Sequence, residues 1–135
     1  MDLKDFKQHV SLCAMSIAEL ESAAGICREE IIKQVSSHGG HLASNLGCVE
    51  LTLALHKVFD PLKNPLLFDV GHQCYTHKLL TGRYEAFQQL REKEGCSGFP
   101  SPGESPCDPV VGGALRECSF GGAGYQCRTG TGKFF

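Results

Sequence analysis

The chain has 135 residues, 41% of them hydrophobic and 21% charged, and a formal net charge of -2 at pH 7. This length suffices for one domain with a buried core, and the composition is that of a globular protein rather than a disordered or fibrous one. The small negative charge and the lack of a lysine or arginine run exclude nucleic-acid binding as the main function. No apolar stretch approaches the roughly 20 residues of a membrane span, and residues 1–10 show no signal-peptide pattern, so we expect a cytoplasmic protein.

Eight cysteines are distributed along the chain without a C-x-x-C pair. Structural zinc sites usually take their ligands from close pairs, and disulfide frameworks belong to secreted proteins. We therefore expect small buried thiols, and we predict no metal site in this chain.

Helical signals dominate the first half of the chain. Ser16 and Glu19 form an S-x-x-E capping pattern, and apolar residues then recur at three- and four-residue steps as far as Val35. This pattern predicts an amphipathic helix that ends near Gly39 and Gly40, which can adopt left-handed conformations. A second helix is expected from about residue 46 to residue 59, buried on most sides because its apolar residues face several directions.

The second half is predicted to contain one strand, one helix and a long loop. Residues 66–70 form a short apolar run between a proline and a glycine, which is typical of an interior strand of a parallel sheet. Residues 84–94 predict a third helix that ends at Gly95. Residues 96–113 hold four of the six prolines and predict a long ordered loop. Helices that alternate with a buried strand indicate an α/β fold, although one strand cannot form a sheet.

The run G-G-H-L-A-S-N-L-G is the first cluster that can carry chemistry, and it places His41 between two predicted helices. A helix N-terminus attracts anions, glycines allow the backbone to approach a ligand, and a histidine can exchange protons near neutral pH. On spacing alone, a capping loop with a surface histidine is the simpler interpretation.

The run D-V-G-H-Q is the second cluster, and it places His72 at the carboxyl end of the predicted strand. Ligands of open α/β sheets bind outside such strand ends, so His72 is the better candidate for ligand binding. His77 and Lys78 fit either a solvated helix start or a role facing a phosphate. His56 lies within a predicted helix, which favours a structural role.

Both clusters and the run G-C-S-G-F-P-S-P-G-E-S-P-C-D lie in one order within residues 16–113. Together they closely resemble the 1-deoxy-D-xylulose-5-phosphate synthase family, which consists of thiamine-diphosphate enzymes of the transketolase superfamily. The resemblance implies the front part of a thiamine-diphosphate-binding domain with a doubly wound parallel sheet, an α/β fold that is mostly helical in this chain.

The resemblance also implies a reaction, in which pyruvate condenses with glyceraldehyde 3-phosphate with loss of carbon dioxide to give a precursor of isoprenoids, thiamine and pyridoxal. Thiamine diphosphate supplies the carbanion chemistry and is held through Mg²⁺, and the parent enzyme is a homodimer. On this resemblance, His41 is the catalytic residue, and His72 and Gly113 contact the cofactor. The magnesium ligands and the glutamate that activates the cofactor belong to family segments absent from this sequence.

The resemblance weakens after Gly113, where the chain reads A-L-R-E-C and the family has H-S-S. Codons for the following residues, reread one nucleotide later, permit His-Ser and then Ala-Ala-Leu-Gly. We therefore predict that residues 1–113 are the front of the cofactor domain and that residues 114–135 are a frameshifted, disordered tail. Such a chain is expected to be inactive alone.

Two other functions fit parts of the same sequence. One is the N-terminal subunit of a split transketolase, against which the D-V-G-H-Q and S-G-F-P runs argue. The other is a binding remnant that has the front of the fold but no catalytic activity.

Overall fold

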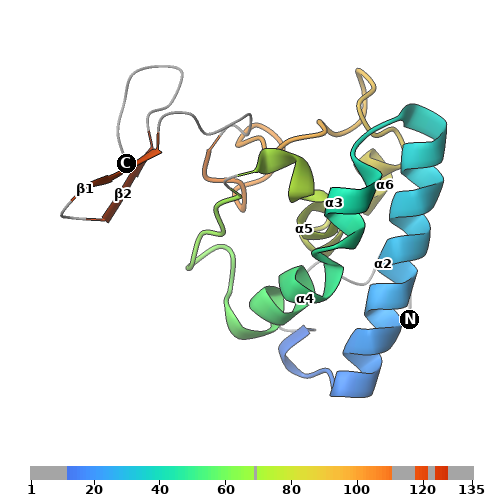
Figure 1. Cartoon of the computed structure of the whole chain (residues 1–135), viewed down its shortest axis with the longest axis horizontal. Coiled ribbons are helices and arrows are strands. Elements are labelled where there is room, and N and C mark those ends of the chain that lie inside the picture. Colours follow the sequence, from blue (N-terminus) through green and yellow to red (C-terminus); the bar gives the residue numbers. More distant parts are fainter. Residues whose placement is uncertain (1–11, 69, 111–117, 122–123, 128–135) are drawn as a thin grey trace.

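The structure, a computed structural model, describes residues 12–68, 70–110, 118–121 and 124–127. The elements in chain order are α2 (Ile17–His38), α3 (Leu42–Leu46), α4 (Val49–Val58), the 3-10 helix η2 (Gly71–Gln73), α5 (Tyr75–Leu80), α6 (Tyr84–Phe87), β1 (Cys118–Gly121) and β2 (Gly124–Cys127). Figure 1 shows the helices gathered in one body, with the two strands apart from it. The part of the chain that the structure describes is mostly helical, as predicted.

Helix α2 begins and ends where the sequence predicts. The Ser16 hydroxyl accepts a hydrogen bond from the Glu19 backbone N–H at 3.3 Å, and the Glu19 carboxylate accepts one from the Ser16 backbone N–H at 2.7 Å. The helix ends at Gly39, where φ is 75°, and Gly40 follows with φ of 141°. Glycine adopts such backbone conformations without the steric cost that a side chain imposes. The predicted capping box and helix end are confirmed.

The core lies where α2, α4 and α5 pack against one another. It consists of side chains whose exposed fraction is 2% or less, among them Cys27, Ile31, Val49, Leu53, Tyr75, Leu79, Phe87 and Leu90. Each fully buried side chain of this kind contributes about 1.5 to 3 kcal/mol relative to its exposed state. This core brings the segments before α3 and before α5 next to each other.

Six cysteines, Cys13, Cys27, Cys48, Cys74, Cys96 and Cys107, are free thiols, and of these Cys27, Cys74, Cys96 and Cys107 are buried as predicted. Burial raises the pKa of Cys27 and of Cys74 to about 12, so neither forms the reactive thiolate at neutral pH. Cys13 differs from the prediction because it is exposed.

The prediction of an interior strand at residues 66–70 is wrong for the described residues of that run. Residues 66–68 adopt no regular structure, Val70 makes an isolated bridge, and Leu67 and Val70 are each 43% exposed. A strand requires a neighbouring strand to accept and donate its hydrogen bonds. Within the described ranges, β1 and β2 are paired with each other, so residues 66–68 have no parallel partner there.

The second predicted helix is present as α4 (Val49–Val58), within the predicted range of residues 46–59, but one of its faces is open. Leu51 and Val58 are 61% and 69% exposed. The expectation of burial on most sides is therefore wrong, because within the described residues the neighbouring helices cover only one face of α4.

The third predicted helix is also shorter than expected, since α6 gives way to turns after Phe87. Arg91 has a φ of 67°, and its backbone N–H donates to the Cys96 carbonyl at 2.7 Å. The chain therefore reverses direction at the point where the periodic pattern predicted a continuing helix.

Strands β1 and β2 form an antiparallel pair in which Phe120 lies opposite Tyr125. They fall within residues 114–135, which the sequence predicts to be a disordered, frameshifted tail. Residues 111–117, 122–123 and 128–135 lie outside the described residues, and the frameshift origin stays a prediction. No helix among the described residues is both long and apolar enough to cross a membrane.

Candidate functional site

His41 and His72 come from separate sequence motifs and meet in space. His41 precedes α3, His72 lies in η2, and their imidazole rings stack with centroids 4.3 Å apart and an interplanar angle of 29°. His41 is exposed and His72 is partly buried, so the pair can be reached from solvent. The structure thus brings together the two histidines that the sequence selected, and their individual roles stay predictions.

A single buried side chain holds the backbone of both histidines. The Asn45 amide nitrogen donates to the His41 carbonyl and to the His72 carbonyl, each at 2.6 Å. The Asn45 amide oxygen accepts from the Tyr75 backbone N–H at 3.0 Å. Sequence reasoning placed Asn45 in a motif but gave it no role, because two of its three partners lie 27 and 30 residues away.

The Tyr75 hydroxyl lies between the two glycine-containing loops. A Cβ atom at Gly40 would lie 2.6 Å from this oxygen, and a Cβ atom at Gly98 would lie 3.5 Å from it. Burial raises the pKa of Tyr75, although a hydrogen bond with the His41 backbone partly opposes this effect. Gly40 is therefore required both for its positive φ and for the close approach of the phenol.

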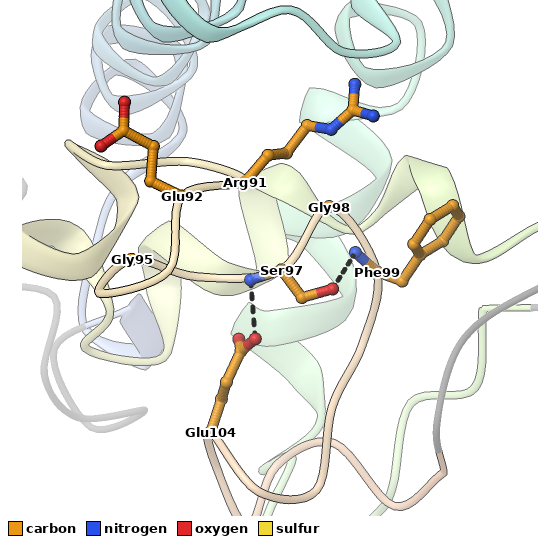
Figure 2. Close-up of a pocket in the computed structure, with 7 residues that line it drawn as sticks. All are labelled: Arg91, Glu92, Gly95, Ser97, Gly98, Phe99 and Glu104. Atoms are coloured by element: carbon orange, nitrogen blue, oxygen red, sulfur yellow. Dashed lines mark hydrogen bonds between the residues drawn. The ribbon is translucent and has the colours of Figure 1, made fainter.

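A pocket of about 400 Å³ borders the same loops, and Figure 2 shows the residues that line it, which are Arg91, Glu92, Gly95, Ser97, Gly98, Phe99 and Glu104. The Ser97 backbone N–H donates to the Glu104 carboxylate at 2.7 Å, which holds one wall of the pocket. An Arg91 guanidinium nitrogen would lie 3.8 Å from a Cβ atom at Gly39, so it borders both the pocket and the loop before His41. A guanidinium in such a position suits an anionic ligand. Sequence reasoning missed Arg91, since nothing in the helical pattern marks it.

A second group of polar side chains, most of them buried, adjoins the pocket through Glu104, which belongs to both. The Asp108 carboxylate accepts from the Arg83 guanidinium and from His77 Nε2, the latter at 2.9 Å. The Lys78 ammonium donates to Glu104, and His77 Nδ1 lies 2.8 Å from His56 Nε2. His56 and His77 are each 1% exposed and Lys78 is 0% exposed.

This buried cluster, defined as His56, His77, Lys78, Arg83, Glu104 and Asp108, changes the interpretation of three sequence candidates. A solvated helix start at His77 and Lys78 is wrong, because both side chains are buried in α5. The ammonium of Lys78 pairs with a carboxylate, and the structure shows no phosphate-facing role for it. The structural role predicted for His56 agrees with its burial against His77.

Burial and hydrogen bonding shift the pKa values in this cluster. Burial lowers the pKa of His77, and the hydrogen bond to Asp108 only partly offsets this effect. Burial alone would raise the pKa of Asp108, but hydrogen bonds from His77 and Arg83 hold it well below its usual range. The carboxylate therefore stays ionised and the imidazole stays neutral near pH 7.

The buried cluster also fixes the proline-rich loop. Glu104 accepts from the Ser97 backbone and Asp108 accepts from the Ser101 backbone, each at 2.7 Å. Since the same carboxylates pair with cations of α5 and of the segment before α6, the loop is anchored to the helical body. Among the described residues, no group of three or more His, Cys, Asp or Glu side chains could hold a metal ion. Gly113, the second predicted cofactor contact, lies outside the described residues.

Residues 3–120 match a family model described as 1-deoxy-D-xylulose-5-phosphate synthase. The chain belongs to this family. The match includes every motif discussed above and extends beyond Gly113, where the sequence motifs lose their resemblance.

Three relatives of this family, each named 1-deoxy-D-xylulose-5-phosphate synthase, illustrate the similarity. The chain is 47% identical to the relative from Syntrophotalea carbinolica over 98% of its own length and 22% of the relative. It is 47% identical to the relative from Nocardia farcinica, covering 90% of the chain and 18% of the relative. It is 55% identical to the relative from Treponema pallidum (strain Nichols), covering 72% of the chain and 15% of the relative. The chain therefore spans less than a quarter of the length of each.

Proposed function

We propose that this chain is the N-terminal part of a 1-deoxy-D-xylulose-5-phosphate synthase, which condenses pyruvate with glyceraldehyde 3-phosphate with loss of carbon dioxide. The observation that carries the proposal is the family match over residues 3–120. It is supported by the stacking of His41 on His72, which unites two of the family motifs in one accessible place.

The described residues fit part of a site for thiamine diphosphate, the cofactor of this family. Two accessible imidazoles and the Arg91 guanidinium, beside the glycine loop at Gly39 and Gly40, are donors suited to an oxygen-rich anionic ligand. The described residues offer no cluster for a metal ion. We therefore assign the Mg²⁺ ligands to the portion of the relatives that this chain does not match.

The cofactor, when bound, supplies the carbanion chemistry of the reaction. We assign the cofactor contact to His72. His41 would donate a hydrogen bond to the substrate carbonyl oxygen, or exchange a proton with it, as a general acid or base. Asn45 donates to the backbone carbonyls of both histidines and not to their rings, which leaves the rings available to a ligand.

We further propose that the full-length enzyme has a doubly wound parallel sheet. The exposed apolar side chains of Leu67 and Val70 support this, because segments of the longer enzyme would cover them. A homodimeric, cytoplasmic parent enzyme belongs to the same proposal.

The proposal is tested with a chimera in which residues 1–113 replace the matching segment of the Syntrophotalea carbinolica relative. We expect the chimera to form 1-deoxy-D-xylulose-5-phosphate, whereas the isolated chain with the substrates, thiamine diphosphate and Mg²⁺ forms none. His72→Ala in the chimera should raise the KM for the cofactor, and His41→Ala should mainly lower kcat, since the first residue binds and the second acts on the substrate.

Two outcomes would contradict the proposal and its assignments. A chimera that folds and binds the cofactor but forms no product would remove the proposed function. Equal, small effects of both substitutions on KM and kcat would show that the roles of the two histidines are wrong.

A further inference from the structure

Asn45 is one of two asparagines in the chain, and its exposed fraction is 0%. A buried amide is unfavourable unless its donors and acceptor are hydrogen-bonded. Both amide hydrogens of Asn45 have separate acceptors, the carbonyls of His41 and His72, and its oxygen accepts from the Tyr75 backbone. This side chain therefore connects the loop before α3, the helix η2 and the first residue of α5.

The connection demands the chemistry of an asparagine. Aspartate at neutral pH has acceptors and no donor, and serine has one donor where two are needed. Helix α3 spans five residues, too few to be stable alone, so its placement depends on contacts such as these. The backbone of His41 lies immediately before α3, and its position relative to His72 follows from the same amide.

We infer that Asn45 is the positioning residue of the histidine pair. Its side-chain amide sets the separation and stacking of the His41 and His72 rings. It thereby sets the relative position in which the two rings meet a shared ligand. The chemical roles of the two rings rest on the proposed function, whereas the geometry of the pair does not. Asn45 acts through the two backbones and touches no ligand.

The test compares Asn45→Asp, Asn45→Leu and Asn64→Asp in the 135-residue chain. Asn45→Asp retains the acceptor for Tyr75 and removes both donors, and Asn45→Leu keeps a similar volume without burying a charge. Asn64→Asp is the matched control, since it makes the same chemical change at the chain's other asparagine, which is exposed. The measurement is the nuclear Overhauser cross-peak between the ring protons of His41 and His72, assigned with His41→Gln and His72→Gln, together with the dispersion of the remaining amide signals.

We expect the cross-peak between the rings to be lost in both Asn45 variants and kept in Asn64→Asp, while the signals of α2 and α4 stay in place. A cross-peak that survives in a folded Asn45 variant would overturn the inference. Collapse of the whole spectrum in both Asn45 variants would overturn it too, because Asn45 would then stabilise the entire body rather than the pair. The readout needs no cofactor or substrate, so failure of the proposed function leaves this result unaffected, and the reverse also holds.

Discussion

The chain contains two pairs of histidines, and their imidazole rings are held in different ways. His41 and His72 stack near the surface, and their backbone carbonyls accept hydrogen bonds from Asn45. His56 and His77 lie inside the body, where the rings themselves form the hydrogen bonds, to each other and to Asp108. The difference teaches that the outer pair is open to a ligand, as its proposed roles require, whereas the inner pair anchors a loop.

The strongest test of this comparison removes the acceptor of the inner pair. Asp108→Ala leaves the Arg83 guanidinium and the His77 ring buried without their shared partner, which we expect to cost about 3 to 5 kcal/mol of unfolding free energy. Urea unfolding of the unaltered chain and of the Asp108→Ala variant measures the difference in unfolding free energy. Lys63→Ala is the control, because the exposed pair with Asp60 should contribute only about 0 to 1 kcal/mol. A loss at Asp108 no larger than that at Lys63 would show that the buried cluster anchors nothing.

The inner pair should also make the stability of the chain dependent on pH. The folded-state pKa of His77 is lowered from its ordinary value of 6.5, so below this pH the unfolded chain binds a proton that the folded chain excludes. The folded-state pKa of Asp108 is lowered from 3.8, so its stabilisation is present above that pH and is lost as the pH falls further. We therefore expect stability to decline in two stages on acidification, the first below pH 6.5 and the second below pH 3.8.

Stability measured by urea unfolding across this pH range tests the expectation. The other members of the buried cluster are Arg83, Lys78, Glu104 and His56. The Arg83 charge adds to the lowering of the His77 pKa. A His77→Gln chain should show a weaker first stage and retain the second. A flat profile of the unaltered chain between pH 7 and pH 5 would contradict the assignment to His77.

The smallest effects are expected at the outer pair. His41→Ala and His72→Ala each remove a ring that contacts its partner on the surface, so we expect each to change the unfolding free energy by no more than about 0.5 kcal/mol. The same urea titrations measure this change, and the Asp108→Ala variant, with its larger expected loss of unfolding free energy, serves as the reference. A loss of several kcal/mol at His41 or His72 would abolish the distinction between the two pairs.

Local signals explain which parts of the fold the sequence predicts. The capping box at Ser16 and the glycines at the end of α2 act through neighbours along the chain, and both are predicted correctly. The split between α3 and α4 and the turn at Arg91 depend on contacts with other segments, such as the Cys96 carbonyl. Periodicity cannot show these contacts, so the predicted helix at residues 84–94 is too long, whereas α4 stays close to its predicted range of residues 46–59.

The residues of the candidate site fall into the same two groups, those that the sequence predicts and those that only the structure reveals. Motif residues with a characteristic chemistry, His41 and His72, are recognised from the sequence, and the structure brings them together. The other residues of the candidate site are Asn45, Tyr75 and Arg91. They reach it through contacts between distant segments, which the spacing of residues in the sequence does not reveal. His77 has a motif position like that of His72, yet its carboxylate partner lies 31 residues away and draws it into the interior.

The open face of α4 has a practical consequence for solubility. Leu51, Val58 and, just beyond the helix, Leu62 are each more than 60% exposed, and together they place apolar surface in water. A net charge of -2 supplies little repulsion between copies of the chain. We therefore expect this helix face to lower the concentration at which the protein precipitates, and sulfate, which strengthens the burial of apolar surface, to lower it further.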